Sequence, residues 1–310
     1  MMAPRDARWV LCDGASHAGA PETALRIGLG HGPWHRISVN IEGMETAMSG
    51  ALSPAWRDLI RLAAFVLAAD CASKRGTLTS VDNGASWRRA FRFVIPVADP
   101  DRWSQPALRQ TLERTLGFLS DDTYRFDFVA AGPRVEGAQL SFQPAGEGRS
   151  FVSWKQVDDV LLFSGGMDSL AGAAEELLVR GRRPLLVSHR SSPKMQAVQR
   201  NLIEELRARS GGSAPWYVGI DIHRHADALR REDTQRTRSF LFASIAGAVS
   251  WLSGQNRVRF HENGIIGLNL PISAQLQGAR GTRTVHPRVL DGFARILGLV
   301  SEQVFAVDNP

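Results

Sequence analysis

The stretch Ser-Gly-Gly-Met-Asp-Ser at residues 164–169 combines residue types that can hold a phosphate chain. It follows an apolar run and opens a segment in which apolar residues recur with helical spacing. Gly165 and Gly166 allow a tight turn and a close approach of the backbone to a ligand. The N–H groups of the turn and of the helix start then form a cradle for an anion, and Ser164 and Ser169 add hydroxyl donors. We therefore predict a phosphate-binding loop at this position.

Asp168 is unusual in such a loop, because a carboxylate repels phosphate. Two roles fit this residue: an N-cap that fixes the loop, or a ligand for a Mg²⁺ ion that bridges phosphates. The spacing differs from the P-loop, which ends in Gly-Lys-Ser/Thr, and from the dinucleotide-binding fingerprint. The loop therefore indicates nucleotide phosphate chemistry of another class.

Strand and helix patterns alternate around this loop. Apolar strand candidates lie at residues 159–163, 184–189, 216–221, 258–261 and 304–307, and helical segments lie at 169–180, 194–210, 239–252 and 287–299. This rhythm predicts an α/β fold, a doubly wound parallel sheet with helices on both faces. Such sheets bind ligands at the carboxyl ends of their strands, which is where the loop lies.

Residues 1–150 predict a smaller α+β domain that precedes the sheet. Apolar residues alternate over 37–41, 91–95 and 124–128, and 139–143 resembles a further strand, while 54–74 and 108–119 carry helical patterns. We expect these strands to form an antiparallel sheet with a role in packing or partner binding. The Gly-rich stretch 144–150 predicts the linker to a second domain, residues 151–310.

Composition limits the class of protein. The 310 residues are 44% hydrophobic, and no apolar run is long enough for a membrane span or a secretory leader, so we expect a cytoplasmic protein. The two cysteines, Cys12 and Cys71, exclude a disulfide framework and a four-cysteine zinc site. The net charge is +6, but only three of 37 basic residues are lysines and the arginines are scattered. We therefore expect no nucleic-acid partner.

The 164–169 loop resembles the SGGxDS motif of the PP-loop ATP pyrophosphatases, whose fold is the adenine nucleotide alpha hydrolase-like fold. The match covers every invariant position of the motif, in the same order of strand, loop and helix: Ser164, Gly165, Gly166, Asp168 and Ser169. The resemblance implies that ATP is cleaved to AMP and pyrophosphate in the presence of Mg²⁺. The loop would then hold the pyrophosphate end of ATP.

Within that superfamily, residues 155–310 resemble the group of QueC, the 7-cyano-7-deazaguanine synthase. Segments 185–202 and 234–249 carry this resemblance, and 260–271 with 278–293 are similar to QueC-like proteins of anti-phage systems of the Qat and type IV CBASS kinds. The resemblance implies an ATP-dependent C–N ligase that adenylates a carboxylate, a 7-carboxy-7-deazaguanine-type base, and transfers it to an amine. Because an extra N-terminal domain is present, we expect an operon-encoded protein partner to supply the amine.

Two departures from QueC are visible. QueC carries a zinc-binding cysteine cluster near its C-terminus, whereas no cysteine follows Cys71 here, so no Zn²⁺ site and no other metal site is assigned. The chain stops just after a strand candidate, and we expect it to be truncated relative to QueC. A tRNA-modifying PP-loop enzyme and a non-catalytic nucleotide-binding subunit of a defence complex are the alternatives. The lack of cysteines in the second half argues against sulfur chemistry.

The candidate site residues fall into three groups. For ATP binding we predict Phe163, Ser164, Gly165, Gly166, Met167, Asp168, Ser169, Ser188 and His189; for catalysis Asp168, Lys194, Arg238 and Arg283; and for substrate binding Glu262, Asn263, Arg280 and His286. Arginine forks suit phosphate oxygens, and a carboxylate accepts two N–H bonds from a purine-like base or binds Mg²⁺. Each polar candidate also has a structural alternative, such as a solvated turn at His189. His223 and His225 have no third ligand and are interpreted as structural.

Overall fold

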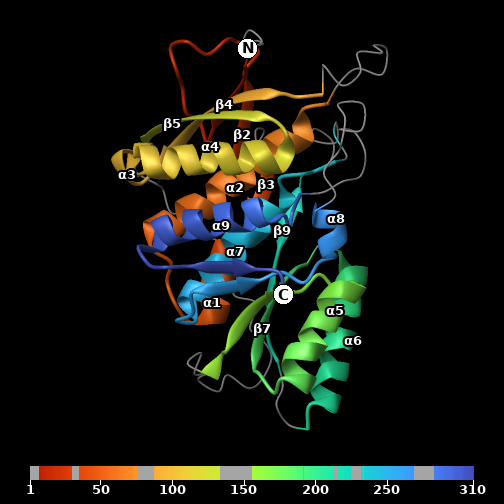
Figure 1. The fold of residues 1–310 in the computed structure, drawn as a ribbon. Helices are drawn as coiled ribbons and strands as arrows, with labels where there is room; N and C mark the ends of the chain where they lie inside the picture. Colours follow the sequence, from red (N-terminus) through yellow and green to blue (C-terminus); the bar gives the residue numbers. More distant parts are fainter. Residues whose placement is uncertain are drawn as a thin grey trace.

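The computed structural model describes residues 7–29, 35–75, 87–132, 156–190, 192–211, 215–224, 232, 234–268 and 283–310, and its strands form two sheets (Figure 1). The first sheet has the order β5-β4-β1-β2-β3-β9. Its strands are β1 (Arg8–Cys12), β2 (Leu25–Leu29), β3 (His35–Val39), β4 (Ala90–Val97), β5 (Thr123–Ala130) and β9 (Ile222–Arg224).

The second sheet is parallel throughout and has the order β11-β10-β6-β7-β8. Its strands are β6 (Asp159–Leu162), β7 (Pro184–His189), β8 (Trp216–Ile220), β10 (Arg257–Arg259) and β11 (Ala306–Asp308). All five predicted strands are therefore present, with ends that differ from the prediction by at most two residues. The chain runs from central β6 to β7 and β8 on one side and then returns to β10 and β11 on the other. The end of β6 lies where this strand order reverses.

Helices connect and cover the strands. They are α1 (Ile41–Met48), α2 (Pro54–Ala72), α3 (Pro100–Ser104), α4 (Pro106–Ser120), α5 (Met167–Ala174), α6 (Pro193–Arg209), α7 (Arg238–Leu252), α8 (Gly264–Leu268) and α9 (Pro287–Ser301). A π-helical turn, Glu175–Val179, continues α5. The helices predicted from apolar spacing are confirmed. Ile41, predicted on a strand, instead opens α1, because the Asn40 side chain caps that helix at the Gly43 N–H.

Helices cover both faces of the second sheet, as its apolar strands predict. Leu161 and Leu186 pack with the α5 and α6 side chains in one cluster. Their neighbours along the strands, Val160 and Leu185, point to the other face and belong to the cluster that contains α7 and α9. This alternation is the period-2 geometry of a strand, and here both faces are apolar because both are covered.

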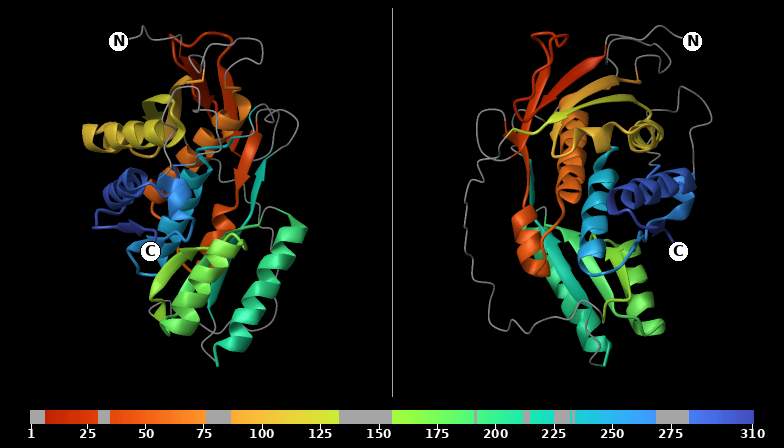
Figure 2. Two further views of the ribbon diagram at one scale, coloured as in Figure 1. Left: turned by 45° about the vertical axis from the view of Figure 1, so that its right-hand side comes forward. Right: turned by 90° about the vertical axis from the view of Figure 1, so that its left-hand side faces the viewer.

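One continuous core joins the two sheets. Helices α2, α7 and α9 lie between them, with the first sheet on one side and the second on the other (Figure 2). Trp56 of α2 is fully buried there and lies 6.2 Å from the Phe305 ring. Strand β9 also belongs to both halves of the chain, because it follows β8 and pairs with β3. The predicted boundary near residue 150 stays a prediction, and the predicted linker 144–150 and strand 139–143 lie outside the described residues.

The first sheet is parallel, and the expected antiparallel sheet of an α+β domain is wrong. Neighbouring strands from β5 to β3 all run parallel, and only the β3–β9 pair is antiparallel. Alternation of apolar and polar residues suggested strands with one wet face, which is typical of antiparallel sheets. Here the alternation has another cause: helices pack on one face only. The opposite face presents Arg92, Arg125 and Asp127, and its small apolar cluster around Leu11 includes no helical residue among those described.

None of the described helices is long and apolar enough to span a membrane. The fold is thus α/β with two mostly parallel sheets, and the predicted phosphate loop follows the central strand of the second one.

Candidate functional site

The loop after β6 needs a glycine at its second position. Gly165 has φ +84°, a left-handed conformation that other residues rarely adopt. A Cβ at this position would lie 3.2 Å from the Gln199 side chain, so there is little room for any side chain. The turn therefore brings α6 close to the loop and directs the chain into α5.

Hydroxyl groups close the turn from inside. The Ser164 hydroxyl accepts a hydrogen bond from the Gly166 N–H at 3.2 Å and lies 3.1 Å from the Ser169 hydroxyl. Ser169 is buried and donates to the Gly166 carbonyl at 3.0 Å, whereas Ser164 is exposed. One serine therefore holds the loop and the other faces solvent, where a ligand would bind.

The N-terminus of α5 is open to an anion. Gly166 is the N-cap, and no side chain accepts a hydrogen bond from the first turn. The N–H groups of this turn carry the positive end of the helix dipole. Asp168 is exposed in the first turn and is not the N-cap, so the capping role proposed for it is wrong. Its other proposed role, contact with a phosphate-bound cation, fits an exposed carboxylate at this end of the helix.

Two buried side chains anchor the loop to its neighbours. The Ser188 hydroxyl on β7 donates to the Phe163 carbonyl at 2.5 Å. The Gln199 amide of α6 donates to the Ser164 and His189 carbonyls, both at 3.2 Å. Ser188 was predicted as an ATP contact and is used here to hold the strand end. Gln199 was not predicted. It shares a helical face with buried Ile203 and Leu206, and a single polar residue on an apolar face can indicate such an anchoring role.

Three charged side chains come together beside the loop from three elements. Asp168 starts α5, Arg238 starts α7, and Glu262 follows β10. The pKa of Glu262 is raised, mainly by partial desolvation. The positive charge of Arg238 acts against this rise and the negative charge of Asp168 adds to it. Glu262 therefore lies within electrostatic range of both Arg238 and Asp168. Glu262 itself remains accessible to solvent. The sequence prediction that these residues share a site is consistent with this placement.

His189 and Arg238 meet at one aromatic ring. The Phe242 ring of α7 lies 5.6 Å from the His189 ring and 5.7 Å from the Arg238 guanidinium carbon. The His189 Nε2 atom also lies 3.2 Å from the Ile222 carbonyl. His189 is therefore half-buried and fixed in place at the end of β7, while Arg238 remains exposed.

Lys194 and Asn263 lie near the same edge of the sheet. Lys194 is exposed in the first turn of α6, and its side chain makes no hydrogen bond or ion pair with the described residues. The Asn263 side chain accepts a hydrogen bond from the Ile265 N–H at 3.1 Å and so starts α8. The backbone of Glu262 is held on both sides by the Asn309 amide. Asn263 thus has a structural role at the start of α8, and it is Asn309 that holds the backbone of Glu262.

Arg283 and His286 make their contacts elsewhere, with α4. Arg283 donates to the Phe118 carbonyl at 2.6 Å and lies 3.6 Å from an Asp121 carboxylate oxygen. His286 caps α9 at the Arg288 N–H and packs 4.8 Å from the Phe118 ring. No contact with the loop supports their predicted roles in catalysis and substrate binding. Arg280 and His225 lie outside the described residues.

Exposed apolar side chains surround the loop, which the sequence analysis did not anticipate. Met167 is 84% exposed, and Ile265 on α8 is 82% exposed. Met195 and Val198 of α6 are also exposed and face Gly165. The described residues contain no group of three or more His, Cys, Asp or Glu side chains that could hold a metal by themselves.

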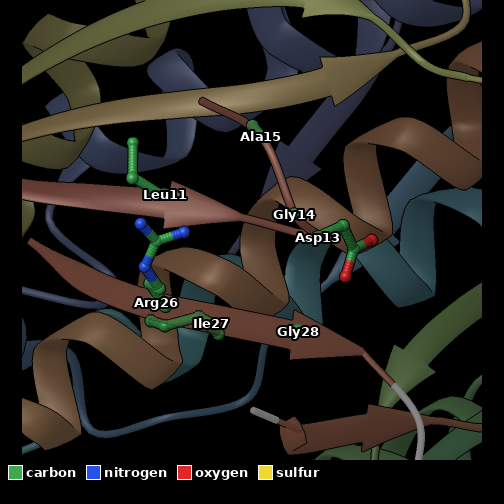
Figure 3. A pocket seen from close by; sticks show the side chains of 7 residues that line it. All are labelled: Leu11, Asp13, Gly14, Ala15, Arg26, Ile27 and Gly28. Atoms are coloured by element: carbon green, nitrogen blue, oxygen red, sulfur yellow. The ribbon is translucent and has the colours of Figure 1, made fainter. Parts of the chain in front are cut away.

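A cavity of about 320 Å³ lies away from this loop, in the first sheet (Figure 3). Leu11 and Asp13 of the β1 end and Arg26 of β2 line it. The chemistry of the 164–169 loop, rather than cavity volume, therefore identifies the candidate site. Comparisons with protein-family models, with curated proteins and with solved structures find no match to this chain.

Proposed function

We propose that this protein binds ATP on the 164–169 loop and cleaves it to AMP and pyrophosphate in order to adenylate a carboxylate. The observation that carries the proposal is the place of the loop. A glycine turn with an open helix N-terminus follows the central strand of a parallel sheet, at the point where the strand order reverses. Ligands of open α/β sheets bind at this point, and the first turn of the helix suits phosphate.

The fold assignment belongs to the same proposal. The second sheet has the strand order of a nucleotide-binding α/β sheet, with helices on both faces. We assign it to the adenine nucleotide alpha hydrolase-like fold, because five motif residues also match the PP-loop pattern.

In the proposed reaction, different residues bind the phosphates and stabilise the leaving group. The Ser164 hydroxyl and the N–H groups of the α5 start bind the β- and γ-phosphates. An oxygen of the substrate carboxylate attacks the α-phosphorus, the bond from this phosphorus to the β-bridging oxygen breaks, and pyrophosphate leaves with the electron pair. Arg238 and Lys194 stabilise the charge on the leaving group. An amine then attacks the acyl carbon, loses its proton, and AMP leaves.

Mg²⁺ fits this site as a partner of the nucleotide. It usually binds proteins through one or two carboxylates and keeps phosphate oxygens and water as its other ligands. Asp168 and Glu262 are two such carboxylates, and they are close enough to influence each other. When bound, the ion would neutralise phosphate charge. The shortage of larger acidic clusters among the described residues is compatible with this kind of site.

For the substrate, we propose a 7-carboxy-7-deazaguanine-type base, with an amine of a partner protein as the acceptor. Glu262 stands beside the loop with a carboxylate that can accept two N–H bonds from such a base. The exposed apolar side chains around the loop, Met167 and Ile265 among them, offer a surface for a partner.

Pyrophosphate release from ATP tests the proposal. We expect release in the presence of Mg²⁺ and 7-carboxy-7-deazaguanine, and a loss of about 10²–10³-fold in Asp168→Ala and in Ser164→Ala. Asp291→Ala is the matched control, because this exposed aspartate of α9 pairs only with Arg295 in the described structure. Intact-mass analysis of operon-encoded proteins then tests the acceptor.

The outcomes separate the levels of the proposal. Pyrophosphate release without the base would support the proposed ATP cleavage and contradict the proposed substrate. Binding of ATP without release would indicate a nucleotide-binding subunit, and release that is unchanged in both loop variants would reject the site itself.

A further inference from the structure

A small cationic pocket lies between α6 and the edge strand β8. Its volume is about 160 Å³, and its polar lining comes from α6, from β8 and from the residue after β7: Arg190, Gln196, Arg200, Glu204, Arg207 and Tyr217. Strand β8 is the edge of the second sheet, so the pocket opens at the side of the molecule. Three guanidinium groups and one carboxylate surround it.

The protein neutralises the charges of this pocket only in part. Arg200 and Arg207 are exposed, and within the described part of the chain their side chains make no ion pair and no hydrogen bond. Arg190 lies 3.3 Å from an Asp221 carboxylate oxygen, but its buried Nε atom has no aligned acceptor. The pocket therefore offers the solvated guanidinium donors of Arg200 and Arg207 together with one buried donor, the Arg190 Nε, which a protein would usually pair.

Glycine at the edge strand positions two of the lining side chains. A Cβ on Gly219 would lie 2.7 Å from the Arg190 Nε and 2.8 Å from the Tyr217 hydroxyl oxygen. Both groups therefore lie directly over the strand, where Arg190 also donates to the Gly219 carbonyl. Burial raises the pKa of Tyr217, while Arg190 and Arg200 act in the opposite direction.

We propose that this pocket binds the phosphate group of a small phosphorylated molecule, separately from the ATP loop. Guanidinium groups present paired N–H donors that match phosphate oxygens. The volume is below that of pockets that enclose whole drug-sized ligands, so it fits one charged group rather than a complete nucleotide. Glu204 lies on the helix between Arg200 and Arg207 and interrupts the positive charge, and the small volume suits one phosphate rather than a continuous nucleic-acid backbone. A single phosphate is therefore favoured over RNA.

Two side chains in sequence connect the pocket with the ATP loop. Tyr217 donates to the Gln199 amide oxygen at 3.3 Å, and the Gln199 nitrogen donates to the Ser164 carbonyl. Occupation of the pocket can therefore act on the loop, but phosphate binding itself does not depend on the proposed adenylation.

Arginine protection with phenylglyoxal, followed by peptide mass mapping on the full chain, tests the inference with AMP as probe. With AMP at about ten times its Kd, we expect modification of Arg200 and Arg207 to slow by about tenfold and Arg209 to stay unprotected. Arg209 is the matched control, because it lies on the same helix and pairs with Glu205 outside the pocket. Protection must persist in Ser164→Ala, which separates this pocket from the ATP loop.

A second variant keeps the test independent of folding defects. Glu204→Gln removes the carboxylate from the pocket, so we expect tighter binding of AMP, whereas Arg200→Ala and Arg207→Ala weaken it about tenfold. Equal protection of Arg209, or the same protection by sodium chloride of equal ionic strength, would overturn the proposal. Stronger protection by a single-stranded RNA without a terminal phosphate would overturn it in favour of an RNA-binding surface.

Discussion

The two sheets of this molecule share a strand order but differ at the end of their first strand. In each, the first strand is central, the next two lie on one side and the last two lie on the other, with β9 added to the first sheet. Each first strand is followed by a glycine with positive φ, Gly14 at +76° and Gly165 at +84°. After Gly165 a helix begins with an open N-terminus, whereas after Gly14 the chain continues in turns.

The difference shows that strand order alone does not make a nucleotide site. In the first sheet, the Asp13 carboxylate accepts from the Leu29 N–H at 2.9 Å and pairs with Arg61, so the strand end is occupied by a negative side chain. In the second, the same place presents backbone N–H groups and hydroxyls. The topology creates a crevice in both sheets, and loop chemistry decides which of them suits phosphate.

The largest effect should appear in the first sheet and concern stability alone. Arg89 lies 2.5 Å from an Asp70 carboxylate oxygen and 2.7 Å from an Asp122 oxygen, and all three are buried. Because Arg89→Met leaves Arg75 as the one remaining guanidinium group against the two buried carboxylates, we expect a loss of about 3–5 kcal/mol in the free energy of unfolding. Urea denaturation measures this. Arg125→Met on the exposed face is the control, with a change within about 0.5 kcal/mol.

The same cluster predicts acid sensitivity. Burial alone would raise the pKa of Asp70, but the Arg89 and Arg75 guanidinium groups outweigh it and leave that pKa lowered. The stabilisation is therefore complete above the ordinary aspartate pKa of about 3.9 and is lost as the pH falls through the lowered value. The free energy of unfolding can be measured with urea from about pH 2 to about pH 6. It should change less steeply with pH in Asp70→Asn than in the wild type. If the free energy of unfolding depended on pH equally in Asp70→Asn and in the Asp291→Asn control, Asp70 would not be the source of the acid sensitivity.

Loss of the loop anchor should reduce ATP binding in the second sheet. Gln199→Leu leaves the Ser164 and His189 carbonyls without their donor, at a cost of about 1–3 kcal/mol. We expect Mg-ATP affinity, measured by calorimetry, to fall about tenfold. Asn201→Leu is the matched control, because it changes an exposed side chain of the same helix. Equal effects of both variants would show that Gln199 does not position the loop.

The smallest effect is expected at the strand end of the first sheet. Asp13→Ala removes a partly exposed ion pair with Arg61 and the bond from Leu29, worth about 1 kcal/mol of stability. Thermal unfolding should show the loss, while pyrophosphate release stays unchanged. A fall in pyrophosphate release in this variant would show that the strand end of the first sheet also contributes to the nucleotide site.

The described strands and helices of the second sheet were well predicted from sequence because local and global signals agree there. Buried strands such as 184–189 are apolar on both faces, and helix starts such as Pro193 and Pro287 carry clear signals. The first half misled the prediction for a physical reason. Arg92 and Asp127 lie on a sheet face without helices, and alternation of this kind does not reveal whether strands are parallel.

The candidate site was predicted in part. The loop could be predicted, because its glycine turn and its hydroxyl groups come from residues that are adjacent in the sequence. The placement of Arg283 against Phe118, and the Gln199 bridge between two carbonyls, depend on contacts between distant segments. Spacing within a single segment contains no information about such contacts. The shared neighbour of His189 and Arg238, Phe242, was missed for the same reason.

A matched pair of glycine variants tests the central claim most directly. Gly165→Ala and Gly14→Ala place the same methyl group at equivalent strand ends, and both strain a backbone with positive φ by about 1–2 kcal/mol. At Gly165 the methyl group would also press on Gln199, whereas at Gly14 it would meet open space. The measurement is Mg-ATP affinity by calorimetry. We predict a loss of about tenfold or more for Gly165→Ala and none for Gly14→Ala; unchanged affinity in Gly165→Ala, or equal losses in both, would contradict the assignment of the nucleotide site to the second sheet.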